Sequence, residues 1–218
     1  MPPQNDRFGR IAEKALCLAL NIDFVGKFPD QMLPEAEALA VRFAAFRPHL
    51  PGEYTHTAAR GARYDYTSPS GYLSLKTTLK DYKVCPQVIG QTTKKNWSIH
   101  FGLPGDSNPD MIKRYIEADL PHILSEYFKY TFESPVVHYN KKNGQGMLIA
   151  ALTPIDWTNE DFTLTRSGEA WTESTTLKIG NITVGEFQIH NHRNNVKFRW
   201  DLKKLLAEFP ANFTVTAV

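Results

Sequence analysis

The sequence predicts a protein built from both helices and strands, and three observations support this class. Apolar residues recur at helical spacing in three segments, at about 7–20, 34–46 and 109–132. In three other segments, at 63–77, 134–152 and 183–200, short strand-like runs lie on both sides of turn-forming residues. The 218 residues are 42% hydrophobic and 22% charged, which suffices for a substantial core. We therefore expect one domain spanning 1–218.

The composition limits the binding partners and the cellular compartment that we expect for the protein. The net charge of +2 is only mildly basic, so binding to nucleic acid would depend on local clusters of Lys and Arg. Two cysteines, Cys17 and Cys85, are too few for a disulfide framework, and Cys17 is expected to be a buried thiol. No run of eighteen apolar residues and no signal-peptide pattern occurs. We expect a soluble cytoplasmic protein with no membrane partner.

The first helix, at about 7–20, carries one unusual charge. Asn5 or Asp6 can cap it, and apolar residues cover most of its surface. Glu13 shares a face with Leu16 and Leu20 by helical spacing, so its carboxylate needs a partner. Two interpretations stay open, an ion pair at the helix edge or an acid delivered to a metal or active site.

The stretch from Arg63 to Thr77 is typical of a strand, a tight turn and a second strand. Alternation places Ser74 and Lys76 on one face of the second strand and Leu73 and Leu75 on the other. Asp65 precedes the turn, so a carboxylate and an ammonium group meet where a metal-bound phosphate could lie. In the preceding loop, Glu53 and His56 are secondary candidates for site residues, although a lone glutamate or histidine in a loop is more often simply solvated.

Three further segments follow, two of which have candidate binding residues. Gln87 and Gln91 share a face if their segment is helical, and Lys94 and Lys95 come directly after them. These four residues fit contact with DNA and an ordinary surface helix equally well. The segment 109–132 is expected to be one amphipathic helix facing the core or a dimer partner. The hairpin at 134–152 has a basic tip that contains Lys141 and Lys142. Two interpretations of this tip stay open, contact with phosphate and an ordinary solvated turn.

The C-terminal strands, 183–190 and 196–200, predict a two-stranded ribbon with one apolar face. Its other face and turn have side chains suited to base edges and phosphates, unless they simply face solvent. These residues are Gln188, His190, His192, Arg193, Asn195, Lys197 and Arg199. A zinc site is not expected, because no Cys/His pair at ligand spacing has a matching second pair.

Taken together, Glu13, Asp65, the turn and the tripeptide Ser74-Leu75-Lys76 resemble the PD-(D/E)XK nuclease fold. The closest similarity is to type II restriction endonucleases of the variant in which serine replaces the second acid. The surrounding segments 83–91 and 185–200 are similar to sequences of such enzymes, and the resemblance covers about half of the chain.

The resemblance implies an α/β core in which a mixed central sheet is flanked by helices. Residues 1–100 would hold the catalytic elements, and 133–218 would be a hairpin-rich DNA-recognition part. It implies Mg²⁺ held by Asp65, with Glu13 and the Leu75 carbonyl as further ligands. Lys76 would activate the attacking water, and Ser74 would act directly or through water.

The resemblance also implies partners. These are double-stranded DNA, a second copy of the chain in a homodimer, and a DNA methyltransferase of the same system that need not be in contact. Three alternatives stay open. They are a repair or structure-specific nuclease of the same superfamily, a DNA-binding protein with a degenerate nuclease site, and a carbohydrate or small-molecule binding domain.

Overall fold

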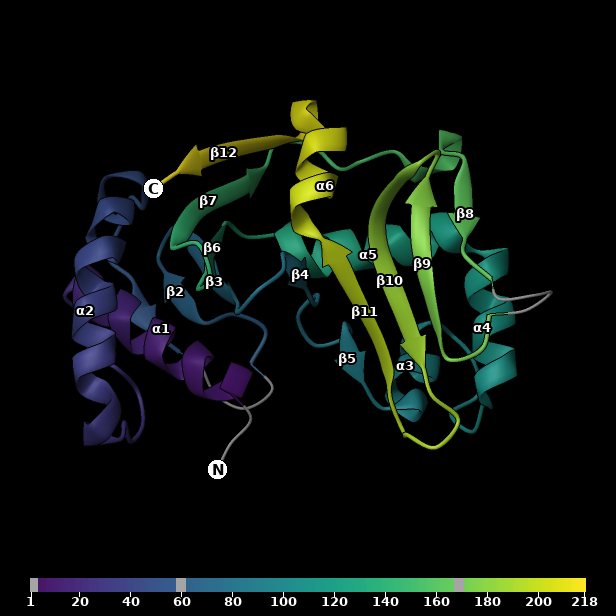
Figure 1. Ribbon diagram of the computed structural model, residues 1–218, viewed down its shortest axis with the longest axis horizontal. Coiled ribbons are helices and arrows are strands. Elements are labelled where there is room, and N and C mark those ends of the chain that lie inside the picture. The colour runs from purple at the N-terminus through teal and green to yellow at the C-terminus, as the bar shows by residue number, and fades with distance from the viewer. Residues whose placement is uncertain (1–3, 58–61, 167–170) are drawn as a thin grey trace. The chain divides into compact units, whose positions relative to one another are not determined.

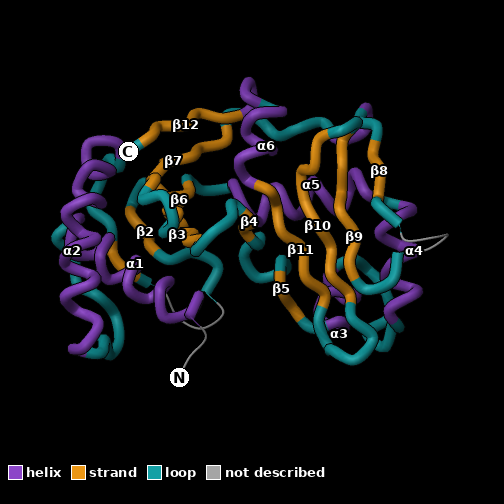
Figure 2. Tube along the Cα trace, viewed as in Figure 1, coloured by secondary structure: helices purple, strands orange, loops and turns teal. Residues whose placement is uncertain are grey.

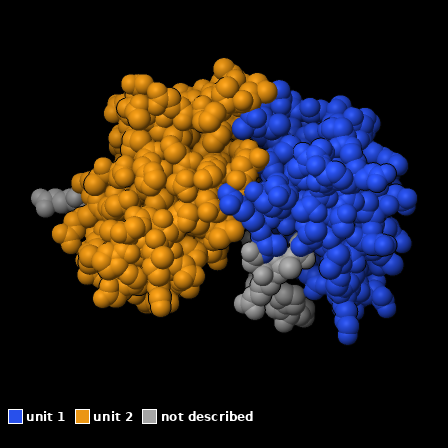
Figure 3. Space-filling model, turned by 180° about the vertical axis from the view of Figure 1, so that it is seen from behind, with its two compact units in different colours: residues 1–81, 134–151, 214–218 blue, residues 82–133, 152–213 orange. Residues whose placement is uncertain are grey.

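A computed structural model describes residues 4–57, 62–166 and 171–218 (Figure 1). The chain divides into two compact units, coloured separately in Figure 3. Unit 1 contains residues 1–81, 134–151 and 214–218, and unit 2 contains 82–133 and 152–213. Each unit is therefore assembled from segments that are distant in sequence. The single domain over 1–218 and its sequential division stay predictions.

Unit 1 is built on a mixed sheet with two helices. The helices are α1 (Gln4–Leu20) and α2 (Leu33–Phe43). The strands, in sheet order, are β1 (Thr55–His56), β2 (Tyr66–Ser68), β3 (Gly71–Thr78), β6 (Val136–Asn140), β7 (Gln145–Ala151) and β12 (Phe213–Ala217). β3 pairs with β6 in parallel, whereas β1–β2, β2–β3 and β6–β7 are antiparallel. The predicted α/β class with a mixed sheet is confirmed here.

The core of unit 1 joins the two helices to one face of this sheet. Leu16 of α1 and Phe43 of α2 lie in one buried cluster with Leu73 and Leu75 of β3, and Figure 2 draws both helices beside these strands. Cys17 is fully buried in the same cluster, and burial raises the pKa of its thiol to about 12. The predicted buried thiol is confirmed, and its high pKa makes it unreactive near neutral pH.

Unit 2 contains a second sheet that the sequence analysis did not separate from the first. Its strands, in sheet order, are β4 (Lys83–Val84), β11 (Val196–Asp201), β10 (Ile182–Ile189), β9 (Ser174–Ile179) and β8 (Phe162–Leu164), with β5 (Gln91–Thr92) also paired to β11. These pairings are antiparallel. The helices are α3 (Lys94–His100), α4 (Pro109–Ala118), α5 (Leu120–Phe132) and α6 (Leu202–Glu208).

The predicted ribbon is formed by β10 and β11, and its apolar face packs on α5. The rings of Tyr127 and Phe198 stack with centroids 4.4 Å apart. The Trp200 indole N–H donates a hydrogen bond to Thr131 Oγ1 at 3.0 Å, so its polar atom is satisfied inside the core. The apolar face inferred from alternation is thereby confirmed as core.

Two helix predictions were wrong in detail. The expected single helix over 109–132 is divided at Asp119 (φ −139°), because Pro121 lacks the N–H that a continuous helix would use. The second helix ends at Phe43 and continues as a 3₁₀ turn that contains Pro48.

The segment from Gln87 to Gln91 is not helical. It forms a tight turn in which a side chain at Gly90 would come within 2.4 Å of the Pro86 carbonyl oxygen, so only glycine fits. Gln87 is buried in this turn, whereas Gln91 is exposed on β5, so the two amides do not share a helix face. Among the described residues, no helix has the length and apolar character needed to cross a membrane.

Candidate active site and polar sheet face

The predicted hairpin is present and positions Asp65. β2 and β3 are joined by a two-residue turn, and Gly71 adopts φ +146°, a conformation that favours glycine. Asp65 lies immediately before β2, and its own N–H donates to the Leu73 carbonyl at 3.3 Å. The Leu75 N–H donates to Asp65 Oδ2 at 2.7 Å. These two hydrogen bonds hold the carboxylate against β3, where the sequence placed it.

Charged groups from several segments converge on Asp65. Burial raises the pKa of its carboxyl group above the usual range, while the positive charge of Lys76 and the Leu75 N–H oppose this shift. The negative charge of Glu13 raises the pKa further, and His56 lowers it. Helix α1 and strands β1 and β3 therefore all contribute to one electrostatic cluster. Of the predicted catalytic residues, Glu13, Asp65 and Lys76 are brought together.

Glu13 is accompanied by a histidine. The Tyr66 hydroxyl donates to the Glu13 backbone oxygen at 2.9 Å, which ties this turn of α1 to β2. His56 Nε2 lies 3.8 Å from Glu13 Oε2. The Val25 N–H donates to His56 Nδ1 at 2.9 Å, so in the neutral ring the proton resides on Nε2 and faces the carboxylate. His56 is 1% exposed and stacks on Phe24, with ring centroids 4.6 Å apart.

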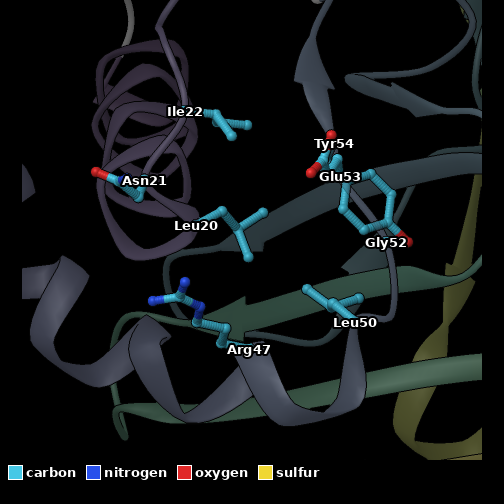
Figure 4. Close-up of a pocket in the computed structure, with 8 residues that line it drawn as sticks. All are labelled: Leu20, Asn21, Ile22, Arg47, Leu50, Gly52, Glu53 and Tyr54. Carbon is cyan, nitrogen blue, oxygen red and sulfur yellow. The ribbon is translucent and has the colours of Figure 1, made fainter.

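His56 was only a secondary candidate in the sequence, and the solvated-loop interpretation of it was wrong. Nothing in its loop indicates burial, because the partners Phe24 and Val25 lie some thirty residues upstream. Glu53, the other secondary candidate, is exposed and lines a pocket of about 500 Å³. Figure 4 shows this pocket between the end of α1 and the loop after α2. The residues that line it in the described structure do not include Glu13, Asp65 or Lys76.

Ser74 and the neighbouring strand β6 bury polar groups. Ser74 is fully buried, and its Oγ lies 3.5 Å from Ser134 Oγ. His138, which pairs with Lys76 across β3 and β6, is also fully buried, and its Nε2 lies 3.2 Å from Thr78 Oγ1. Burial lowers the pKa of His138 to about 4, so the ring is neutral at pH 7. Sequence analysis missed His138, although a histidine inside an apolar strand was a signal.

In unit 2, polar side chains form a row across three strands. Strand register pairs Lys197 of β11 with Gln188 of β10 on one side and with Gln91 of β5 on the other. Paired residues point to the same face of a sheet, so the three side chains are neighbours. We call these three residues the polar row. The structure thus joins Gln91 to the ribbon, which the helical interpretation of its segment had not suggested.

The next row of the same face is occupied by an ion-pair cluster. Arg199 and Lys83 both donate to the carboxylate of Glu186, and the Gln188 amide donates to Glu186 Oε1 at 2.9 Å. Burial alone would raise the pKa of Glu186, but these donors and their positive charges lower it overall. Arg199 is therefore held by an acid of its own sheet. The sequence predictions did not include this pairing, which depends on the register of Glu186 with Arg199.

The other predicted DNA-binding residues lie in separate places. Lys94 and Lys95 begin α3, and Arg193 and Asn195 lie in the β10–β11 turn, where His190 and His192 contact Glu173. Lys141 and Lys142 lie in the β6–β7 turn of unit 1, with Lys141 Nζ 4.7 Å from the centre of the Phe8 ring. No observation on the structure tests their binding to DNA, which stays a prediction.

The cluster around Asp65 has the donor chemistry of a Mg²⁺ site. Mg²⁺ prefers carboxylate and carbonyl oxygens, and Glu13 and Asp65 supply two carboxylates. Burial is the largest cause that raises the pKa of Asp65, and the negative charge of Glu13 adds to it; a bound divalent cation would oppose both effects. The residues present therefore fit the ion. Leu75, whose N–H is bonded to Asp65, stays a predicted carbonyl ligand.

Comparison with known proteins shows that most of the chain is similar to a restriction enzyme. Over 214 aligned residues it is 40% identical to the type II restriction enzyme CviAII of Paramecium bursaria Chlorella virus 1. The alignment covers 95% of this chain and 61% of that relative, so the chain spans about three fifths of the relative's length. No protein-family model and no solved structure matches the chain. The similarity therefore includes both the cluster around Asp65 and the ribbon of unit 2.

Proposed function

We propose that this chain is a site-specific endonuclease of the type II restriction class that hydrolyses phosphodiester bonds in double-stranded DNA. The observation that carries the proposal is that Glu13 of α1 and Lys76 of β3 both act electrostatically on the buried Asp65, which the Leu75 N–H holds against β3. Similarity to a type II restriction enzyme over 95% of the chain supports it independently of this geometry. We further assign the site to the PD-(D/E)XK superfamily, in the variant with Ser74 at the second acid position.

The roles of the residues follow from charge. Hydrolysis adds negative charge to the phosphate oxygens in the transition state, and the Lys76 ammonium group stabilises that charge and orients the attacking water. Asp65 and Glu13 would hold Mg²⁺, with the Leu75 carbonyl as a further ligand. When bound, this ion supplies Lewis-acid polarisation of the phosphate and stabilises the leaving oxygen.

Two buried neighbours complete the proposed site. His56 directs its Nε2 at Glu13, so we assign it the role of positioning that carboxylate. Ser74 is a neutral hydroxyl, and its full burial beside Ser134 favours a role in orienting groups around Asp65 over that of a strong ligand.

DNA recognition is assigned to unit 2. The polar row of Gln91, Lys197 and Gln188 offers amide and ammonium groups that can read adenine and guanine edges. The enzyme would act as a cytoplasmic homodimer on a symmetric site, because two copies place one active site on each strand. A DNA methyltransferase of the same system would protect the host site.

The experiment is digestion of a phage genome by the purified chain with Mg²⁺, followed by sequencing of the fragment ends. Discrete fragments that all end within one short sequence are expected. Ends at random sequences, or cleavage only at damaged or branched DNA, would instead identify a repair or structure-specific nuclease. Binding to duplex DNA without cleavage in either Mg²⁺ or Mn²⁺ would identify a degenerate site and reject the proposed activity.

A further inference from the structure

Three side chains with metal-binding chemistry gather at the turn end of the β10–β11 ribbon. The ligating atoms of Glu173, His190 and His192 all lie within 4.8 Å of one another. His190 Nδ1 lies 2.7 Å from Glu173 Oε2, and His192 Nδ1 lies 3.3 Å from Glu173 Oε1. Both imidazole rings therefore present the same type of nitrogen to one carboxylate.

The backbone holds this arrangement in place. Glu173 immediately precedes β9, and its carbonyl accepts the Ile189 N–H at 2.7 Å, which fixes it beside the end of β10. His190 and His192 flank Asn191 at the start of the turn. The hydrogen bond from His190, helped by the charges of both imidazoles and by the Asn191 N–H, lowers the pKa of the Glu173 carboxyl group. The carboxylate is thus ionised and aimed at both rings at neutral pH.

We propose that Glu173, His190 and His192 form a binding site for a divalent transition-metal ion of the Zn²⁺ type. Two imidazoles and one carboxylate are a donor set that holds zinc with a fourth position open to water. Ligands about 2 Å from a tetrahedral zinc ion lie about 3.3 Å apart. The 3.3 Å between His192 Nδ1 and Glu173 Oε1 matches this spacing, and His190 Nδ1 lies closer to the carboxylate, at 2.7 Å. Imidazole nitrogens favour such ions over Mg²⁺, so this site differs in kind from the oxygen-rich cluster of unit 1.

Metal binding has a consequence for the ribbon. The ion would replace the hydrogen bond between His190 and Glu173 and the contact between His192 and Glu173. It would displace the protons from the ligating imidazole nitrogens and join the start of β9 to the β10–β11 turn. The residues that follow in this turn, Arg193 and Asn195, would be held in one arrangement. His190 and His192 then act as ligands rather than as the DNA contacts expected from the sequence.

The test is calorimetric titration of the full-length, chelator-treated protein with Zn²⁺ in the presence of excess Mg²⁺. About one equivalent per chain should bind and release protons to the buffer. Co²⁺ substitution should give a visible spectrum typical of nitrogen and oxygen ligands. The His192→Ala and Glu173→Gln variants should each lose at least about tenfold in affinity and lose the thermal stabilisation by Zn²⁺.

A matched control comes from the same unit. His100 Nε2 lies 3.1 Å from Glu126 Oε2, a histidine–glutamate pair for which the described residues supply no third ligand. His100→Ala should therefore leave Zn²⁺ affinity unchanged. Absence of Zn²⁺ binding, or binding that His192→Ala and Glu173→Gln do not weaken, would overturn the proposal. Because the readouts are binding and stability, failure here leaves the proposed nuclease activity separately testable.

Discussion

The two units place polar side chains in opposite ways on their sheets. In unit 1, Ser74 and His138 are fully buried, and Asp65 is buried deeply enough for its pKa to rise. In unit 2, Gln188 and Arg199 are half-exposed on an open face, where Glu186 neutralises part of the charge. Burying polar and charged groups is costly, whereas a solvated and internally paired face costs little.

The buried polar groups of unit 1 indicate where the chemistry takes place. Burial raises the pKa of the Asp65 carboxyl group, and an ionisable group that is perturbed by burial beside specific charged partners marks a candidate functional site. The open face is better suited to a reversible partner, since its amides and ammonium groups remain accessible. The expected division is that changes in unit 1 abolish cleavage, while changes in unit 2 alter the choice of DNA.

The largest effect is expected for Asp65→Asn and Lys76→Met. Each removes a charge that supports phosphodiester hydrolysis, so the rate with Mg²⁺ should fall at least about 1000-fold. Circular dichroism should show an unchanged fold, because neither substitution changes side-chain volume greatly. Initial rates on plasmid DNA measure the loss.

Asp23→Asn provides the control for these variants, since Asp23 is an exposed acid of the same unit. It should cleave at the wild-type rate. Near-normal cleavage by the Asp65→Asn or Lys76→Met protein would remove the proposed active site from this hairpin.

The second effect concerns stability and pH. The pKa of His138 is lowered in the folded state from 6.5 to about 4, so between these values the unfolded chain binds more protons. The contribution of the neutral His138 ring to the free energy of unfolding is fully present above about pH 6.5 and is lost as the pH falls toward 4. Between pH 7 and pH 5 this group should cost the wild type about 2 kcal/mol of unfolding free energy.

Urea unfolding of His138→Gln should lack this part of the pH dependence. His122→Gln changes an exposed histidine on α5 and should retain the wild-type pH profile. Identical profiles for His138→Gln and the wild type would mean that His138 titrates normally, which would weaken the contrast between the two units.

The sequence predicted local features of both regions and missed those that depend on distant contacts. The hairpin carrying Asp65 and Lys76, and the ribbon carrying Gln188 and Arg199, follow from alternation and turn residues within twenty positions. The burial of His56 depends on Phe24 and Val25, and no local pattern encodes such a contact.

The same limit explains the other differences. Gln87 and Gln91 were expected to share a face only if their segment was helical, and spacing alone cannot distinguish a helical turn from the tight turn that Gly90 requires. The neutralisation of Arg199 by Glu186 needs the strand register, which sequence does not specify. Periodicity also missed the break at Asp119, because apolar spacing continues across Pro121.

The third prediction concerns the polar row. Replacing Gln188 or Lys197 by Ala should weaken binding to the preferred site by about 1–2 kcal/mol more than binding to random duplex. Lys178 on β9 lies on the same sheet but outside the row, so Lys178→Ala should preserve the ratio of specific to random binding. Competition binding at fixed salt measures that ratio. An equal loss on both DNAs would reassign the row to phosphate contact.

The smallest effect is expected at His56, where positioning can be separated from chemistry. Its Nε2 faces Glu13 from 3.8 Å, while Val25 fixes the ring from the other side. In His56→Gln the carboxylate loses this partner, so cleavage should fall about tenfold, and the Mg²⁺ concentration for half-maximal rate should rise. Saturating Mg²⁺ should restore most of the rate if His56 only positions a ligand. A reduced rate that Mg²⁺ cannot restore would mean that His56 acts on the substrate itself, and an unchanged Mg²⁺ requirement would mean that His56 does not position a metal ligand.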